Sequence, residues 1–132
     1  MMPVYQDKFG LDWTKPDAGN CLQACLASVL EVALDAVPHF VVLEDHHDAM
    51  NRWLLEHYGL YVLAFPSTGP EPWAQGYYLQ SGKGPRGAEH IVVMKDGELA
   101  HDPIGENGPG LSEVTCTWVF VSPEPKLAKV AR

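Results

Sequence analysis

The feature that most constrains the fold is an apolar segment with helical periodicity that begins at a cysteine. Its apolar side chains recur at spacings of three and four residues, which places them on one face of an α-helix. They are Leu22, Cys25, Leu26, Val29 and Leu30. Asn20 is a favoured N-cap residue, so we expect a helix over residues 20–34 with Cys21 as its first residue. Free N–H groups and the positive end of the helix dipole favour a thiolate there.

The periodicity then changes from helical to strand-like. A second helix is expected over residues 45–58, with Gly59 as its C-cap. Short β-rich runs separated by Gly/Pro loops predict strands at residues 60–65, 77–79, 91–94, 98–101 and 115–121. Asp96-Gly97 is a strong hairpin signal between the third and fourth of them. This order predicts a single α+β domain over residues 1–132, with a helical layer packed on an antiparallel sheet of about 4–5 strands.

Composition and charge narrow the range of partners. The formal net charge of −8 argues against nucleic acid, because phosphate binding needs clustered Lys and Arg, and the basic cluster at residues 126–132 is interpreted as a frayed tail. No apolar run approaches a membrane span and the N-terminus lacks a signal pattern, so we expect a cytoplasmic protein without a membrane partner. Three cysteines indicate reduced thiols rather than a disulfide scaffold.

Two residues of the expected hairpin are candidate partners for Cys21. His90 stands at the start of one strand, and Asp102 follows the end of the next. With the turn near residues 96–97, positions 90 and 102 or 103 fall roughly opposite each other, where Cβ atoms are about 5 Å apart. A nucleophile, a base and a residue that orients the base are the requirements of thiol hydrolysis. Cys21, His90 and Asp102 are therefore the candidate catalytic residues, with no cofactor or metal.

Such a reaction also needs donors for the developing oxyanion. The backbone N–H of Cys21 is one candidate. Gln6 is our candidate for the second, and Asp17 and Asn20 are alternatives.

Other residues have simpler interpretations. Cys25 and Cys116 are expected to pack in the core, and His101 to face solvent on the side opposite to residue 102. His46 and His47 are interpreted as a solvated helix start, because adjacent histidines diverge on a helix. The aromatic residues are expected either to pack in the core or to line a groove with rims at residues 66–75 and 81–88. They are Trp13, Trp53, Trp73, Tyr77 and Tyr78.

The cysteine motif resembles those of two groups of thiol peptidases. Gly-Asn-Cys-Leu at residues 19–22 is similar to the motif of ovarian-tumour-type deubiquitinases. Cys-Leu-Gln-Ala-Cys-Leu at residues 21–26 resembles the Cys-Gly-Pro-Ala-Cys-Leu element of peptidases that process bacteriocin leaders. In that group a later His-x-Val-Val strand and an Asp-Pro complete the triad, and residues 90–93 and 102–103 match both in order and spacing. Both groups belong to the papain-like superfamily, which places Cys on a central helix and His on the sheet.

The resemblance covers about residues 17–30 and 88–104. It implies a papain-like fold with Cys21 as nucleophile, His90 as base and Asp102 as orienter. The layout also resembles small bacterial and phage proteins of unassigned role. Two positions depart from the patterns: Lys15 stands where the bacteriocin-leader group has its oxyanion Gln, and Ala18 separates the preceding Asp from Gly-Asn.

These observations predict a thiol hydrolase that cleaves a peptide, isopeptide or related amide bond in a peptide or protein substrate. Acyl transfer and side-chain deamidation use the same groups. The alternative is a catalytically inactive papain-like module or inhibitor that binds a protein partner. A third interpretation is a metal-binding domain that uses Cys21, Cys25 and His90. The sequence leaves the substrate and the oligomeric state open.

Overall fold

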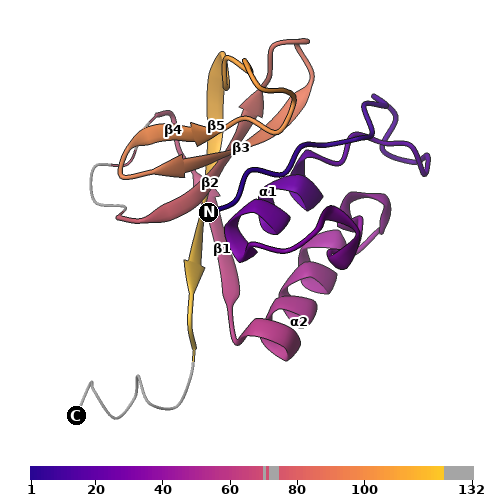
Figure 1. Ribbon diagram of the computed structural model, residues 1–132, viewed down its shortest axis with the longest axis vertical. Helices are drawn as coiled ribbons and strands as arrows, with labels where there is room; N and C mark the ends of the chain where they lie inside the picture. Colours follow the sequence, from indigo (N-terminus) through magenta and orange to yellow (C-terminus); the bar gives the residue numbers. More distant parts are fainter. Residues whose placement is uncertain (70, 72–74, 124–132) are drawn as a thin grey trace.

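The computed structural model describes residues 1–69, 71 and 75–123, and it has the expected α+β architecture (Figure 1). Trp73 and the basic cluster at residues 126–132 lie outside the described residues. The order of elements is two helices followed by five strands, with two 3₁₀ turns between the helices. Among the described residues, no helix has the length and apolar character needed to cross a membrane.

Both helices form where the periodicity predicts them. Helix α1 spans Cys21–Leu30 and α2 spans His46–Tyr58, followed by Gly59 at φ 65° as its C-cap. Helix α1 ends four residues before the expected boundary, because Glu31 adopts a left-handed conformation (φ 59°) and its N–H bonds the last turn. The chain continues through the 3₁₀ turns η1 (Leu34–Ala36) and η2 (Phe40–Val42).

Five antiparallel strands form one sheet in the order β1-β5-β2-β3-β4. Their bounds are β1 Tyr61–Pro66, β2 Tyr77–Lys83, β3 Glu89–Lys95, β4 Glu98–His101 and β5 Glu113–Val121. The second strand is longer than expected, because Gln80, Ser81 and Gly82 pair with both β3 and β5 in the middle of the sheet. The tertiary pairing thus extends a strand into residues of low β-propensity.

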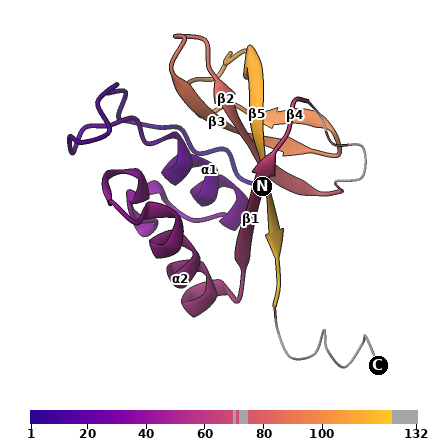
Figure 2. The ribbon, with the colours of Figure 1, turned by 180° about the vertical axis from the view of Figure 1, so that it is seen from behind.

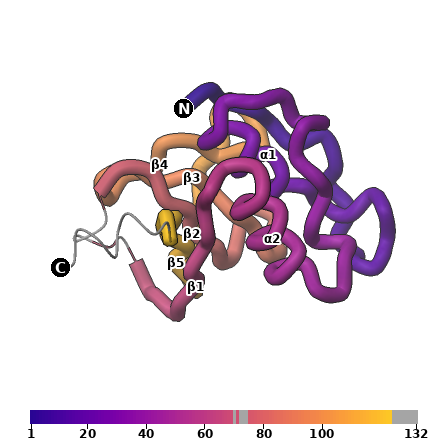
Figure 3. The backbone as a smooth tube through the Cα atoms, turned by 90° about the horizontal axis from the view of Figure 1, so that it is seen from below, coloured from indigo at the N-terminus to yellow at the C-terminus, as the bar shows by residue number. Residues whose placement is uncertain are grey.

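The two helices cover one face of the sheet (Figures 1 and 2). Helix α1 packs on β3, α2 contacts β1 and η2, and the view from below places both helices on the same side (Figure 3). The buried apolar face of α1 and the inward residues of the strands form one core. This core includes Leu22, Leu26, Met50, Leu54, Val62, Leu79, Ile91 and Val93. The N-terminus of α1, and with it Cys21, is therefore held rigidly against the sheet.

The hairpin of β3 and β4 turns at Asp96-Gly97, as the sequence predicts. Asp96 and Gly97 both have positive φ (51° and 87°), and Lys95 pairs with Glu98 across them. The register shifts between Val93 and Met94, however, so Val93 pairs with His101. Asp102 therefore leaves the ladder instead of lying directly opposite position 90. The expected neighbourhood of the two residues is correct, but simple cross-strand pairing is not its cause.

Candidate thiol active site

Cys21 occupies the position that the helix pattern predicts. It is the first residue of α1, so its backbone N–H has no acceptor within the helix. Its side chain is 6% exposed, and it lines a cavity of about 830 Å³ together with Gln6 and His90. The thiol is therefore sheltered from bulk water and open to a bound molecule.

His90 and Asp102 form a buried pair. His90 Nε2 lies 2.6 Å from Asp102 Oδ1, and the two residues are 3% and 4% exposed. Because Nε2 is engaged by the carboxylate, Nδ1 is the ring nitrogen available to Cys21. Asp102, which follows β4, thus contacts the imidazole directly.

The loop after β4 fixes the Asp102 carboxylate. Oδ1 also accepts a hydrogen bond from the N–H of Ile104 (3.0 Å), and Oδ2 accepts one from the N–H of Gly110 (2.9 Å). Gly108 packs against the same side chain so closely that a Cβ there would lie 2.6 Å from Asp102 Cβ. Both oxygens are satisfied, so the carboxylate has one well-defined orientation.

These contacts shift the pKa values of the pair in opposite directions. Burial alone lowers the pKa of His90, but the hydrogen bond that it donates to Asp102 and the interactions with Cys21 outweigh it and raise this pKa to about 9. Burial raises the pKa of Asp102, but the hydrogen bonds from His90, Ile104 and Gly110 outweigh it and lower the net value. The favoured neutral-pH state is an imidazolium between a carboxylate and the Cys21 side chain.

Gln6 reaches the site from the N-terminal segment. Its backbone N–H donates to Pro103 O (2.9 Å) and its Nε2 to Lys8 O (2.9 Å), while the residue is 5% exposed. Within the part of the chain that the structure describes, its buried Oε1 has no hydrogen-bond partner. The amide therefore lines the Cys21 cavity with an unused acceptor and a second N–H on Nε2.

Asn20 precedes α1 as expected, but the prediction that its side chain caps the helix is wrong. Its Oδ1 accepts hydrogen bonds from the N–H groups of Asp7 (3.1 Å) and Lys8 (2.9 Å) instead. Its Nδ2 donates to Asp7 Oδ1 (2.8 Å) and Gln23 Oε1 (3.1 Å). These bonds hold the segment that carries Gln6 beside the start of α1. They also commit the Asn20 amide, so Asn20 is not free to bind an oxyanion.

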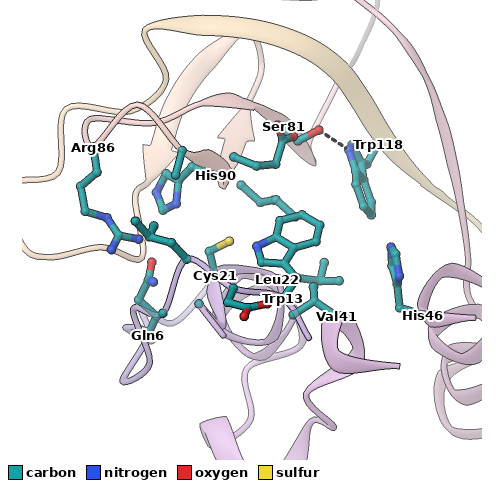
Figure 4. Close-up of a pocket in the computed structure, with 17 residues that line it drawn as sticks. Gln6, Trp13, Cys21, Leu22, Val41, His46, Ser81, Arg86, His90 and Trp118 are labelled. Carbon is teal, nitrogen blue, oxygen red and sulfur yellow. Dashed lines mark hydrogen bonds between the residues drawn. The ribbon is translucent and has the colours of Figure 1, made fainter. Parts of the chain in front are cut away.

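The cavity has two distinct ends around Cys21 (Figure 4). His90 and Gln6 lie on one side, and Trp118 and His46 lie on the other. Trp13, one of the aromatic residues expected in the core or a groove, lines the cavity and is 40% exposed. Of the two expected rims, residues 81–88 contribute Ser81 from β2 and Arg86 and Ala88 from the loop before β3, whereas none of the described residues of 66–75 lines the cavity. Asp17, the other oxyanion alternative, does not line this cavity.

Of the two expectations about the other cysteines, one is confirmed and one is wrong. Cys25 is fully buried in the core, as predicted; its Sγ donates to Ile91 O (3.4 Å), and burial raises its pKa. Cys116 lies in β5 but is only half-buried and does not belong to the core, so the prediction of core packing is wrong. No group of three His, Cys, Asp or Glu side chains able to hold a metal occurs among the described residues.

The histidines outside the pair are less exposed than expected. His101 is 7% exposed, its Nε2 bonds Val4 O (2.7 Å), and its ring packs edge-on against Tyr5. The prediction of a solvent-facing His101 is wrong, because the N-terminal segment covers that face of β4. His46 and His47 are half-buried; His47 packs against Trp118 (5.5 Å between rings), so this helix start is not simply solvated.

Sequence reasoning missed the glycines that shape the site. A Cβ at Gly84 would lie 2.6 Å from His90 Cβ, just as one at Gly108 would collide with Asp102. Both stand in loops where many glycines serve only turns, so sequence spacing alone gives no signal for their role. Their positions around His90 and Asp102 become visible only when the loops close over the hairpin.

No protein-family model matches this chain, and neither a curated protein nor a solved structure shows significant similarity to it. The residues and geometry of the site itself therefore provide the basis for a proposed function.

Proposed function

We propose that this protein is a papain-like thiol hydrolase that cleaves a peptide, isopeptide or related amide bond. The single observation that carries the proposal is the buried 2.6 Å contact of Asp102 with His90, where His90 lines the same cavity as Cys21 at a helix start. Cys21, His90 and Asp102 would supply the nucleophile, the base and the orienter that acyl transfer requires.

The reaction follows from these positions. The Cys21 thiolate attacks the substrate carbonyl, and a C–S bond forms while the carbonyl oxygen becomes negative. The imidazolium of His90 then gives its proton to the leaving amine as the C–N bond breaks. Water enters, His90 removes a proton from it, and the resulting hydroxide attacks the acyl-enzyme. Collapse of the second intermediate releases the acid and restores the thiolate–imidazolium pair.

Two groups are placed to stabilise the oxyanion of both intermediates. The N–H of Cys21 is free of intrahelical bonding, and Nε2 of Gln6 has an N–H beyond the one given to Lys8. The role that the related peptidases give to a Gln six residues before Cys would thus pass to Gln6 in this chain. Lys15, which stands at that position, is exposed.

The first test is the rate of alkylation by iodoacetamide between pH 6 and pH 9, with each modified cysteine located by mass spectrometry. At pH 6 we expect Cys21 to react about 100-fold faster than the half-buried Cys116, whose pKa is raised by burial. Cys116 is thus an internal reference in the same molecule. His90→Ala should remove most of the difference. Equal, slow reaction of both thiols would contradict the proposal and favour the binding module.

The second test is hydrolysis itself. A mixture of tryptic peptides from a cell lysate is incubated with wild type and with Cys21→Ala, and new termini are identified by mass spectrometry. Cleavages that depend on Cys21 support the proposal. An activated Cys21 with no such cleavage would redirect the search to isopeptide substrates and acyl transfer.

A further inference from the structure

The cavity around Cys21 is built asymmetrically with respect to the reacting groups. The donors and the base, Gln6 and His90, are on one side of Cys21 (Figure 4). On the other side the wall is largely apolar, and His46 lies there among side chains from α1, η2, β5 and the N-terminal loop. The apolar side chains are Leu22, Val41, Trp118 and Trp13.

This asymmetry fixes how an amide can lie, given the proposed function on which the inference rests. The leaving amine must approach His90, because His90 has to protonate it. The acyl part then extends from the Cys21 sulfur away from His90, toward Trp13 and Trp118 (Figure 4). The apolar end is consequently the acyl side of the scissile bond.

The polar groups at that end are few. Trp118 Nε1 donates to Ser81 Oγ (2.9 Å), the Trp118 ring packs against His47, and His46 lies at the same end (Figure 4). Arg86 lies on the His90 side of Cys21, where it donates to Phe9 O (2.7 Å) and lies over the Phe9 ring (5.7 Å). An anionic acyl side chain would therefore meet no guanidinium at the Trp118 end, whereas an apolar one would replace water on the apolar side chains there.

The N-terminal loop adds exposed apolar surface to the cavity. Two large apolar side chains of this loop line the cavity and remain exposed to solvent. They are Leu11 (67%) and Trp13 (40%). Exposed apolar groups beside a cavity are typical of a surface that receives an apolar ligand.

We propose that this apolar end is a specificity subsite for a large aromatic or branched aliphatic side chain on the acyl side of the scissile bond. The substrate class is thus a peptide with a Phe-, Tyr- or Leu-like residue there. Small residues such as Gly leave the apolar wall without contacts, and acidic residues lose hydration at an end of the cavity that holds no guanidinium.

The test uses N-acetyl amino-acid chloromethyl ketones with Phe, Leu, Gly and Glu side chains. The Cys21 thiolate forms a bond to the methylene carbon and chloride leaves, so the rate reports how the acyl part binds. Second-order inactivation constants are divided by the rates of the same reagents with glutathione, which removes differences in intrinsic reactivity. We expect Phe and Leu to exceed Gly and Glu by more than 10-fold.

Variants locate the preference in the apolar end. Trp13→Ala removes an exposed side chain and should reduce the Phe-to-Gly ratio to below about 3-fold, and Val41→Trp should do so by filling the space. Leu63→Ala, an equally exposed apolar residue on β1, is the matched control and should keep the wild-type ratio. Because the ratio is measured within each variant, a general loss of reactivity does not imitate the result.

The outcomes separate the two proposals. Rapid alkylation of Cys21 by iodoacetamide at pH 6 together with a Phe-to-Gly ratio near 1, or with a preference for Glu, overturns the subsite and leaves the thiol hydrolase standing. An unchanged Phe-to-Gly ratio in both Trp13→Ala and Val41→Trp also overturns the subsite. Slow reaction of Cys21 with every reagent overturns the hydrolase and the subsite together.

Discussion

The two sides of the proposed catalytic residues differ in how completely their polar groups are satisfied. Both oxygens of Asp102 accept hydrogen bonds, from His90, Ile104 and Gly110, and Gly108 packs against the carboxylate. On the Gln6 side, by contrast, Nε2 donates one N–H to Lys8 O and has a second N–H for a bound molecule, while the buried Oε1 has no partner among the described residues. The hydrogen bonds of the Asp102 side are thus complete, whereas those of the Gln6 side are not.

This difference indicates which part of the site is pre-organised. A fully satisfied carboxylate holds the imidazole in one orientation before any substrate arrives, so no reorganisation is needed during reaction. On the Gln6 side, the group that could bind an oxyanion is the second N–H of Nε2, because the buried Oε1 is an acceptor and repels negative charge. Substitutions of Asp102 and of Gln6 should therefore have different effects on hydrolysis and on alkylation of Cys21.

The largest expected effect comes from Asp102, whose hydrogen bonds are complete. Asp102→Asn keeps the shape but replaces the anionic acceptor of His90, so the raised pKa of His90 should fall toward its ordinary value. We expect Cys21-dependent hydrolysis at pH 7 to fall about 10³-fold, because the imidazole loses its orientation and its charge stabilisation. Hydrolysis within a factor of three of wild type would show that Asp102 is only a turn residue.

The second-largest expected effect comes from Gln6, the proposed oxyanion donor. Gln6→Ala should lower the kcat of hydrolysis by about 10²-fold, because one oxyanion donor is lost. Iodoacetamide alkylation passes through no oxyanion, so it should fall much less. The measurement is the ratio of the two losses in the same variant. Equal losses would indicate that Gln6 supports the cavity wall and does not stabilise the transition state.

A matched pair of glycine variants tests whether close packing in the loop after β4 fixes the Asp102 side chain. Gly108→Ala places a Cβ 2.6 Å from Asp102 Cβ, whereas nothing lies within 4 Å of a Cβ at Gly105 in the same loop. We expect Gly108→Ala to reduce hydrolysis about 10-fold and to cost about 1–3 kcal/mol of stability through overpacking. Gly105→Ala should change neither quantity appreciably. Similar behaviour of both variants would contradict the close packing on Asp102.

The smallest expected effect at neutral pH is the change in the free energy of unfolding with pH. The pKa of His90 is raised to about 9, so between pH 6.5 and pH 9 the folded state binds more protons at this site than the unfolded state. This stabilisation is complete below pH 6.5 and is lost as the pH rises through 9. Urea unfolding should show a decline of at most about 1.4 kcal/mol per pH unit in that window. His90→Gln should flatten it, and an equal decline in that variant would assign it to another group.

Much of the architecture followed from local patterns. The end of α2 at Gly59 and the turn at Asp96-Gly97 are set by residues that tolerate positive φ, which act over a few positions. The proximity of His90 and Asp102 was also predictable, because the hairpin turn brings the ends of its two strands together, but the register shift between Val93 and Met94 sets their final positions. Local chemistry is readable from a sequence because its partners are close in the chain.

The fine structure of the site depends on contacts between distant segments. The Asn20 side chain accepts hydrogen bonds from the N–H groups of Asp7 and Lys8 and makes no capping bond to α1. His101 bonds Val4 and packs against Tyr5.

The sequence by itself therefore determined the helices, most of the hairpin and the identity of the three candidate residues. Only the tertiary structure decided the bulge that moves Asp102 out of the ladder, the glycine contacts that fix the pair, and the apolar wall opposite His90. These features arise from packing among α1, the sheet and the N-terminal loop. Packing among segments so far apart in the chain leaves no periodicity in any one of them.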